Sequence, residues 1–459
     1  MKNNIILNSD SYKYSMPWQY PPGTEYVYSY IESRGGPWAH TVFFGLQAYI
    51  KQYLTTPITM EDINEAEEII LANGEPFYRE GWEYILKEHN GYLPVIIKAV
   101  PEGTIIPVKN VLATIENTDP KCFWLPTFLE TSFLRGVWYG TSVATNSWVS
   151  KNIIKKWLTK NGDINSINFK LHDFGSRGVS SLESAELGGA AHLINFSGTD
   201  NVASLRFARY YYNAGSIGFS VPAMEHSTIT SWKRENEVEA YRNMISNNAN
   251  GIVSIVSDSY NIFEACKMFG TVLKQDIIDN NIQLVVRPDS GDPARIVLRC
   301  LEILDEYFGH TFNDKDFKVL NNNVKVLQGD GIDHDTIEKI LFFTDIHGYS
   351  SDNLLFGQGG QLLQGVTRDT QKWAMKCSAV RVNGEWRDVY KDPITDPGKV
   401  SKKGRVTLYK NLDGTFYSGR EDWPESALKT VFENGKLVTE YTFDEIRKNA
   451  SLTSLLNAV

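Results

Sequence analysis

The sequence predicts an α/β fold, in which a closed or nearly closed barrel of parallel strands occupies the middle of the chain. From about residue 168, strand-like runs alternate with helical segments at a spacing of roughly 30 residues, which is typical of parallel βαβ units. The flanking regions lack this alternation, and 459 residues are too many for one ordinary core. We therefore expect domain limits at 1–150, 151–376 and 377–459, with the two ends packing together as one discontinuous α+β domain.

The N-terminal part, 1–150, mixes probable helices with short strands. Residues 61–71 have the periodicity of a helix, and residues 94–100 read as a strand followed by a turn at 101–103. These elements carry no motif of their own, so we expect them to build the core of the discontinuous domain.

Seven short apolar or alternating runs carry the barrel prediction, and each ends in a loop that contains Gly, Asp, Arg or His. They are residues 167–172, 192–196, 217–221, 251–256, 282–286, 324–327 and 353–356. The segment 293–308 between two of them places its apolar residues on one helical face, and Pro293 suits the first turn. In such barrels the chemistry lies at the carboxyl ends of the strands. The polar loop residues stand at those ends.

After residue 376 the strand-like pieces return. Residues 378–382 and 405–409 read as strands, and the segment that starts at Phe443 reads as a final helix. We expect this part to pack with the N-terminal part.

Composition excludes several classes of protein. The net charge of −9 argues against a general nucleic-acid binder. We expect no membrane partner, because no run of about 18 apolar residues occurs and residues 1–10 are too short and polar for a signal peptide. The four cysteines are far apart with no CxxC, as in reduced thiols, so we expect a cytoplasmic protein.

Glycine-rich loops follow the last two strands of the predicted barrel. Gly329 and Gly331 follow the sixth run, and the segment 357–360, with Gly359 and Gly360, follows the seventh. Glycines let backbone N–H groups approach a phosphate, and late-strand loops of a barrel are a frequent phosphate site. The structural alternative is a tight strand-to-helix turn. Two such loops in consecutive units favour phosphate binding.

Charged residues stand at several other strand ends. Arg287 and Asp289 follow the fifth run, where an arginine can bind an anion and a carboxylate can hold ribose hydroxyls. The alternative is a structural ion pair that caps the next helix. Asp258 and Asp330 occupy equivalent positions, where carboxylates orient a substrate or contact a hydrated Mg²⁺.

His226 stands next to Glu225 at another predicted strand end, where a histidine can be catalytic. Its structural alternative is a helix start capped by Ser227 or Thr228. We expect no metal site held by the protein, because no HExxH or histidine-rich cluster occurs.

Sequence blocks spread along nearly the whole chain resemble the nicotinamide phosphoribosyltransferases, members of the type II phosphoribosyltransferases. These blocks lie at 10–13, 20–22, 98–103, 116–120, 143–146, 170–175, 177–181, 198–200, 225–230, 256–260, 287–291, 328–331, 401–405 and 443–450. The resemblance implies an irregular α/β (TIM-like) barrel, a homodimer with shared active sites, and a reaction in NAD salvage. That reaction joins nicotinamide to phosphoribosyl pyrophosphate, giving nicotinamide mononucleotide and pyrophosphate.

The resemblance also assigns roles to the pyridine pocket. Phe174 and, from the partner subunit, Tyr12 are expected to sandwich the ring. Asp200 is expected to accept a hydrogen bond from the carboxamide, and Arg287 to lie beside the ring.

A second set of expected roles concerns phosphate and ATP. Asp289 and Asp330 would hold ribose hydroxyls. The 5′-phosphate would be surrounded by Gly329, Gly359 and Gly360. Pyrophosphate would be bound by Arg177, with Arg34, Arg368 and Lys376 across the dimer interface. His226 would be phosphorylated by ATP, with Asp258 in support and Glu225 alongside. Mg²⁺ would be bound through pyrophosphate, with ATP as co-substrate. Without the resemblance, the scattered basic residues read as solvated surface charges.

Two alternatives remain from the sequence. Nicotinate phosphoribosyltransferase has the same fold and another acceptor, and Asp200 argues against it because a carboxylate repels nicotinate. A catalytically inert binding or signalling relative is the other, and the intact set of Asp, Arg and His residues argues against it.

Overall fold

The computed structural model describes residues 3–423 and 425–456, and the chain divides into two compact units. Unit 1 comprises the chain up to Thr145, Ala208–Ala214 and the chain from Val366. Unit 2 comprises Asn146–Phe207 and Gly215–Gly365. The unit limits at 145/146 and 365/366 differ from the expected limits at 150/151 and 376/377, and no sequence pattern predicted that 208–214 returns to unit 1.

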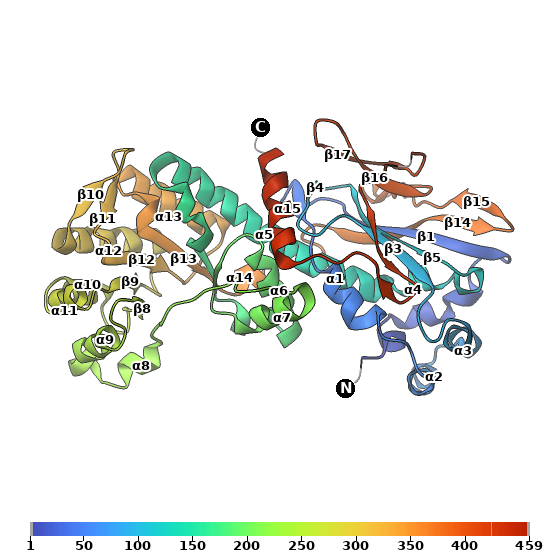
Figure 1. Ribbon diagram of the computed structural model, residues 1–459, viewed down its shortest axis with the longest axis horizontal. Coiled ribbons are helices and arrows are strands. Elements are labelled where there is room, and N and C mark those ends of the chain that lie inside the picture. The colour runs from blue at the N-terminus through green and yellow to red at the C-terminus, as the bar shows by residue number, and fades with distance from the viewer. Residues whose placement is uncertain (1–2, 424, 457–459) are drawn as a thin grey trace. The chain divides into compact units, whose positions relative to one another are not determined.

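Unit 1 is built on a seven-stranded antiparallel sheet in the order β15-β14-β1-β5-β3-β18-β19. The strands are β1 (Thr24–Ser33), β3 (Val95–Ala99), β5 (Val111–Asn117), β14 (Trp373–Val382), β15 (Glu385–Asp388), β18 (Lys429–Glu433) and β19 (Lys436–Leu437). Two further pairs join β2 (His40–Val42) to β4 (Ile105–Pro107), and β16 (Val406–Lys410) to β17 (Phe416–Arg420). Strand β1 therefore lies between a strand of the C-terminal part, β14, and a strand of the N-terminal part, β5 (Figure 1).

The helices that begin in unit 1 are α1 (Leu46–Tyr49), α2 (Met60–Asn73), α3 (Arg79–Glu88), α4 (Leu125–Phe128), α5 (Glu130–Asn161) and α15 (Phe443–Leu456). A cluster of fully buried aromatic side chains, including Trp82, Trp124 and Phe128, packs against the sheet strands. The predicted helix at 61–71 and the strands at 94–100, 378–382 and 405–409 are confirmed, as is the final helix from Phe443.

Unit 2 contains a six-stranded parallel sheet in the order β7-β6-β13-β12-β9-β8. Its strands are β6 (Leu171–Asp173), β7 (Gly198–Thr199), β8 (Ile252–Val256), β9 (Gln283–Arg287), β12 (Val324–Gln328) and β13 (Leu354–Gln358). Its helices are α6 (Leu182–Leu193), α7 (Val202–Tyr212, whose end lies in unit 1), α8 (His226–Thr230), α9 (Glu237–Ser246), α10 (Ile262–Gly270), α11 (Lys274–Asp279), α12 (Pro293–Phe308), α13 (His334–Ile346) and α14 (Gly360–Leu363). A short hairpin joins β10 (His310–Phe312) and β11 (Lys318–Leu320).

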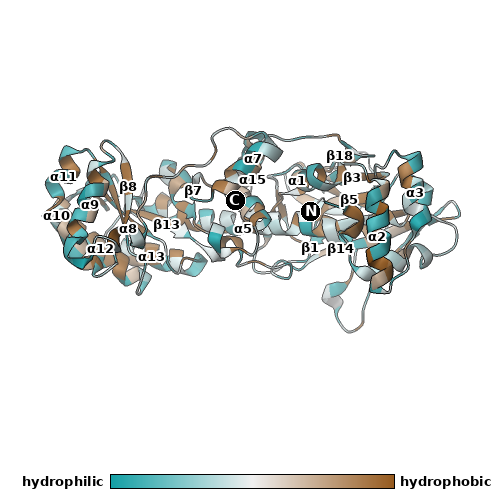
Figure 2. Cartoon of the chain, turned by 90° about the horizontal axis from the view of Figure 1, so that it is seen from below, coloured by the Kyte–Doolittle hydropathy of each residue, from teal (hydrophilic) through white to brown (hydrophobic). Residues whose placement is uncertain are grey.

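The helices of unit 2 bury apolar faces against this sheet. Helix α12 begins at Pro293, as predicted, and Asp292 caps it by accepting from the backbone N–H of Arg295 at 3.0 Å. Its buried face includes Val297, Leu301 and Leu304. Figure 2 shows the same division, with hydrophilic and hydrophobic residues on single helices. Burial of this face explains why the periodicity predicted the helix bounds.

Two of the predicted strands are wrong. The run 192–196 begins inside α6, and the strand that follows it is only Gly198–Thr199. Ser181 caps α6 by accepting from Ser184 N at 3.2 Å, and the small buried residues of α6, such as Ala190, let it pack closely. The run of apolar residues was thus the buried end of a helix, which has no strand periodicity.

The third predicted strand, 217–221, forms only isolated parallel bridges, Gly198↔Phe219 and Ala223↔Ser254. Pro222 has no N–H to donate to a ladder, which favours an irregular path here. Unit 2 is therefore a mixed α/β unit with a curled parallel sheet that resembles half of a barrel, and the expected TIM-like barrel is not confirmed.

Glu102 is a buried titratable residue of unit 1. Its carboxylate accepts from the backbone N–H of Gln47 at 2.6 Å and of Gly45 at 3.3 Å, at the start of α1. Burial raises the pKa of Glu102 to about 7, although these hydrogen bonds lower it. A carboxyl whose folded pKa lies above its unfolded value destabilises the fold as pH rises between the two values.

We predict that wild-type protein loses stability between pH 5 and pH 7.5 relative to Glu102→Gln, by up to about 3 kcal/mol. The glutamine keeps an acceptor for Gln47 and cannot ionise. Thermal melts of both proteins across this pH range would measure the difference. A difference in Tm that does not change with pH would contradict the buried-carboxylate account.

Candidate functional site

The carboxyl ends of the parallel strands bring the predicted residues of unit 2 to one edge of the sheet. Neighbouring strands run in the same direction and in register, so the loops that follow them meet. The loops after β6, β7, β8, β9, β12 and β13 carry, respectively, Phe174 with Arg177, Asp200, Asp258, Asp289, Gly329 with Asp330, and Gly359 with Gly360.

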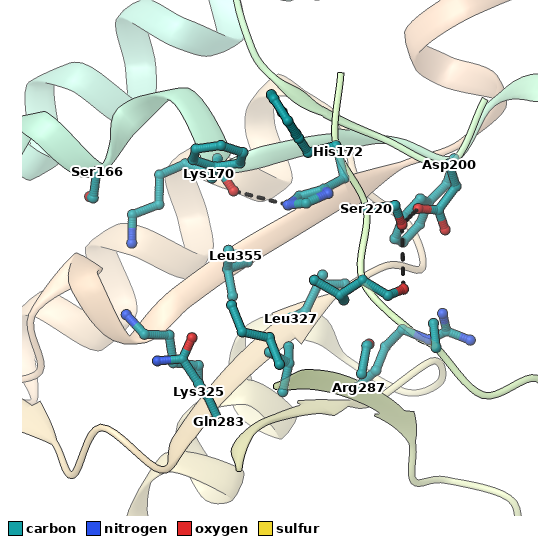
Figure 3. A pocket seen from close by; sticks show the side chains of 18 residues that line it. Ser166, Lys170, His172, Asp200, Ser220, Gln283, Arg287, Lys325, Leu327 and Leu355 are labelled. Carbon is teal, nitrogen blue, oxygen red and sulfur yellow. Dashed lines mark hydrogen bonds between the residues drawn. The ribbon is translucent and has the colours of Figure 1, made fainter. Parts of the chain in front are cut away.

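A largely apolar cavity of about 440 Å³ opens among these strands, all of its lining residues belonging to unit 2. In Figure 3, Asp200, Ser220 and Arg287 lie toward one end, and Lys170, Lys325 and other polar residues toward the opposite end. Between them lie apolar side chains such as Leu327 and Leu355. A flat aromatic ligand with one polar substituent fits this lining.

Phe174 forms part of the cavity wall, and glycines make room for its ring. An ideal Cβ on Gly357 would lie 2.1 Å from Phe174 Cε2, so any larger residue there would displace the ring. A Cβ on Gly329 would lie 3.4 Å from Asp289 Oδ1, 3.5 Å from Phe174 Cε2 and 3.7 Å from Arg287 Cδ. Gly329 therefore marks the point where these three predicted residues converge.

Asp200 is held at the rim of the cavity by both its side chain and its backbone. Its Oδ1 accepts from the Ser220 hydroxyl at 2.6 Å, and its N–H donates to the Asp173 carbonyl at 3.0 Å. The buried Asp173 carboxylate accepts from Gly175 N at 2.7 Å and from Asn201 Nδ2 at 3.0 Å. Burial raises the pKa of Asp173 to about 6. This network fixes the loops that carry Phe174 and Asp200.

Arg287 ends β9 with an unused hydrogen-bond donor. Its Nη2 donates to the Met224 carbonyl at 3.4 Å, while its Nε is buried and has no hydrogen-bond partner among the described residues. A buried unpaired donor costs free energy, so the position suits an acceptor supplied by a ligand.

His226 begins α8 and pairs with Asp258. His226 Nε2 lies 2.9 Å from Asp258 Oδ1, and the Ser290 hydroxyl donates to Asp258 Oδ2 at 2.6 Å. Burial raises the pKa of Asp258, but the hydrogen bonds from Ser290 and His226 outweigh it and hold that pKa below its usual value. Glu225 is the exposed residue before α8 and makes no side-chain cap there. Ser227 and Thr228 lie within α8 and do not cap its start, so the helix-cap alternative is not what the structure shows.

Asp289 lies among charged neighbours from several loops. Burial raises its pKa, Arg287 and His226 lower it, and Asp258 and Asp330 raise it. Asp289 thus shares its electrostatic environment with the carboxylates of two other strand ends. Asp292, not Asp289, caps the following helix, so the alternative assigned to Asp289 is not what the structure shows.

The glycine loop after β13 packs against the segment after β6. A Cβ on Gly175 would lie 2.8 Å from the Gly359 carbonyl oxygen, and one on Gly178 would lie 2.9 Å from Gly360 Cα. The exposed Arg177 stands between these two contacts along the chain. The predicted phosphate residues of unit 2 thus lie together.

A second cavity, in unit 1, gathers the remaining predicted basic residues. This basic pocket has a volume of about 580 Å³, and its cationic lining consists of Arg34, Arg368, Lys372, Lys376, Lys391 and Lys399. Arg34 Nη2 is buried without a hydrogen-bond partner among the described residues. Burial lowers the pKa of Lys376, as do the nearby charges of Arg34 and Lys391, while Glu130 raises it. Such a concentration of cations suits a polyanion.

Tyr12 lines neither cavity. It lies in a 3₁₀ segment (Ser11–Trp18) of unit 1 with 58% of its surface exposed, and the Lys13 ammonium lies 5.3 Å from its ring centroid. An exposed tyrosine beside a buried lysine is available to a second protein molecule.

Sequence reasoning missed several lining residues. They are His172, Ser220 and Lys170 in the apolar cavity, and Lys372, Lys391 and Lys399 in the basic pocket. Burial lowers the pKa of His172, so its ring is neutral at physiological pH. His172 lies inside a block singled out for its resemblance, which was a usable signal. The three lysines lie in loops and had none.

The fold and both cavities define a phosphoribosyltransferase. The model of the nicotinate phosphoribosyltransferase (NAPRTase) family matches residues 169–436, and that of the nicotinamide phosphoribosyltransferase N-terminal domain matches residues 4–97. Among solved structures, nicotinate-nucleotide pyrophosphorylase from Pyrococcus furiosus has a TM-score of 0.67 at 16% identity, covering 100% of this chain and 98% of its own. Human nicotinic acid phosphoribosyltransferase has a TM-score of 0.59 at 14% identity, covering 98% and 94%. These two similarities concern the fold.

Sequence relatives are more specific. A nicotinamide phosphoribosyltransferase from Xanthomonas campestris pv. campestris is 51% identical over 99% of both chains. One from Acinetobacter baylyi is 35% identical over 97% of this chain and 96% of its own. The chain therefore belongs to the nicotinamide phosphoribosyltransferase family, which confirms the resemblance read from the motifs.

In the part of the chain that the structure describes, no helix is long and apolar enough to cross a bilayer.

Gly357→Ala should weaken nicotinamide binding by about tenfold or more, because the new methyl group must push the Phe174 ring out of place. Calorimetric titration would measure the affinity, and circular dichroism would show that the variant is folded. Gly215→Ala is the matched control, since a Cβ there meets no atom within 4 Å. Unchanged affinity in a folded Gly357→Ala protein would contradict the assigned position of the ring.

Proposed function

We propose that this chain transfers the phosphoribosyl group of phosphoribosyl pyrophosphate to nicotinamide, giving nicotinamide mononucleotide and pyrophosphate in NAD salvage. The observation that carries the proposal is the carboxylate of Asp200 at the rim of an apolar cavity, on a loop that hydrogen bonds to Asp173 join to the loop of Phe174. The names of the 51% and 35% identical relatives support the same reaction.

The acceptor pocket favours an amide over an acid. In this proposal the pyridine ring stacks on Phe174, and Asp200 accepts from the carboxamide NH₂. A carboxylate at Asp200 would repel the carboxylate of nicotinate, so discrimination arises partly from repulsion. Arg287, with its unpaired buried Nε, would lie beside the ring and help fix the amide.

The phosphoribosyl donor requires both cavities in this proposal. Asp289 and Asp330 hold ribose hydroxyls, and Gly329, Gly359 and Gly360 surround the 5′-phosphate. The pyrophosphate is bound by Arg177 together with Arg34, Arg368 and Lys376 of the basic pocket, which the second subunit of a homodimer supplies. The exposed ring of Tyr12, also from the second subunit, closes the sandwich over the pyridine.

Catalysis would then rest on positioning and charge. The pyridine nitrogen forms a bond to C1 of the ribose as the C1–O bond to pyrophosphate breaks, and positive charge builds on the sugar. The leaving pyrophosphate carries away the electron pair, and the cations of the basic pocket stabilise its growing negative charge. Stacking on Phe174 aligns the nitrogen with C1, which removes much of the entropic barrier.

Mg²⁺ enters the proposal bound through pyrophosphate oxygens, where it would neutralise the leaving group. Among the described residues, the only group of three possible metal ligands within 4.8 Å of one another is His89, Asp119 and Cys122. These line neither cavity, so the residues at the site fit a metal carried by substrate better than one held by the protein.

ATP is the proposed co-substrate. Its γ-phosphoryl group would be transferred to His226, whose Nε2 is oriented by Asp258, and Glu225 lies alongside. The pairing with a carboxylate favours the imidazolium that forms after transfer.

Three further parts belong to the same proposal. Residues 217–224 hydrogen-bond to both edge strands of the parallel sheet, at Thr199 N→Phe219 O (3.0 Å) and Met224 N→Ser254 O (2.9 Å), which supports an irregular barrel. Residues 151–376 would act as the phosphoribosyltransferase domain, with 1–150 and 377–459 together as the second domain.

The four free cysteines support a cytoplasmic setting.

Purified protein should turn over nicotinamide and not nicotinate, and Asp200→Asn should lower kcat/KM for nicotinamide by about tenfold or more while reducing the preference between the two acceptors. Paired assays with each acceptor would measure this. Turnover of nicotinate alone would overturn the acceptor assignment. If folded wild-type protein turned over neither acceptor, the result would favour the alternative that the chain is a catalytically inert relative.

His226→Ala should abolish stimulation by ATP while retaining some basal synthesis, because the histidine acts in the ATP step and not on the pyridine. Initial rates with and without ATP would measure the effect in wild type and variant. An unchanged response to ATP would refute the phosphohistidine.

A further inference from the structure

The basic pocket of unit 1 takes part of its lining from a long loop. This loop joins β15 to β16, and it contributes Lys391 and Lys399 to the pocket. Lys376 on β14 and Lys391 on the loop lie close enough to interact, and the charge of Lys391 lowers the pKa of Lys376. An exposed loop holds its charges in place only if its ends are fixed, since an ordered loop costs conformational entropy.

The two ends of the loop are fastened to each other at Ser401. The Ser401 hydroxyl accepts from Lys391 N at 2.8 Å, and Ser401 N donates to the Lys391 carbonyl at 2.9 Å. Both ends are also fastened to β14, because Val389 N and Gly404 N each donate to the Ser378 carbonyl at 2.8 Å. Lys391 is thus held at the base of a closed loop, and Ser378, the residue of β14 to which the loop ends bind, lies two residues from Lys376.

Lys402 fastens the loop to β1. Its N–H donates to the Tyr30 hydroxyl at 2.9 Å, and its ammonium donates to the Lys109 carbonyl at 2.7 Å and forms an ion pair with Glu32. In β1, Tyr30 stands opposite Lys376 of β14, so this anchor lies beside the pocket.

Glu32 connects Lys402 to a pocket cation. The Glu32 side chain is only 4% exposed, and its other oxygen lies 3.4 Å from Arg34 Nε. The Arg34 guanidinium also has a buried Nη2 without a partner among the described residues. Without Lys402, the Glu32 carboxylate would have Arg34 as its main counterion. Arg34 would then be less available to an anion bound in the pocket.

We propose that Ser401 and Lys402 are positioning residues for the pyrophosphate group. Ser401 holds the loop that carries Lys391 and Lys399, and Lys402 neutralises Glu32 so that Arg34 remains available to the anion. Neither side chain lines the pocket, so both act through other residues. The inference rests on the proposed function, which places pyrophosphate in this pocket.

The chain supplies a matched control for Lys402. Lys403 is the next residue and carries the same charge, but it lies over the Tyr390 ring at 5.2 Å and does not line the pocket. Lys402→Met and Lys403→Met therefore remove equal charge from adjacent positions. Ser401→Ala removes no charge, and Lys402→Arg keeps a cation that can donate to Glu32.

The experiment is calorimetric titration of the full-length protein with magnesium pyrophosphate, with thermal melts to establish folding. We expect Kd to rise about fivefold in Ser401→Ala and about tenfold in Lys402→Met, and to change less than twofold in Lys403→Met and Lys402→Arg. The KM for phosphoribosyl pyrophosphate should rise in parallel, with little change in the KM for nicotinamide.

Equal effects of Lys402→Met and Lys403→Met would overturn the inference, because they would show loss of general charge attraction alone. Unchanged Kd in a folded Ser401→Ala protein would overturn the role of Ser401, whatever Lys402→Met does to stability. If wild-type protein turns over nicotinamide but all of these variants bind pyrophosphate with the wild-type Kd, the inference is overturned and the proposed function stands. Wild-type protein that neither binds pyrophosphate nor uses phosphoribosyl pyrophosphate would overturn both.

Discussion

The parallel pairing of β6, β13, β12, β9 and β8 is the constraint on which the site depends. Parallel strands place all of their carboxyl ends at one edge, so residues far apart in sequence meet there. Phe174, Asp200 and Asp289 follow three different strands, and the close approach of Gly329 to Phe174, Asp289 and Arg287 shows how tightly their loops converge. Antiparallel pairing would have divided the same residues between two edges of the sheet.

The two cavities differ in polarity and charge, so each suits a different ligand. The cavity of unit 2 is mostly apolar, with a carboxylate and an arginine near one end, and suits a neutral aromatic acceptor. The pocket of unit 1 is lined by six cations and by the carboxylates of Asp369 and Asp396, and this excess of positive charge suits an anion. Glu32 and Glu130, which pair with Arg34 and Lys376, reduce the repulsion within this pocket and set which donors remain free.

Much of the fold and most of the site follow from the sequence. The bounds of α12 follow from its apolar face and Pro293, and the strand ends at Arg287 and Asp258 follow from short apolar runs before polar loops. The run 192–196 failed because a fully buried helix end has no periodicity, and 217–221 failed because Pro222 interrupts a strand. Lys391 and Lys399 were missed because their positions depend on the hydrogen bonds of one loop, which no local pattern records, whereas Lys402 lies in the block 401–405 but was given no role there.

The most direct test of the account is a crystal structure of the protein with nicotinamide mononucleotide and pyrophosphate. We predict that the pyridine ring stacks on Phe174 and that the carboxamide nitrogen lies within hydrogen-bond distance of Asp200. The pyrophosphate should contact Arg34 and Lys376 of a second subunit. A pyridine ring bound away from Phe174 and Asp200, or a pyrophosphate that does not contact the basic pocket, would contradict it.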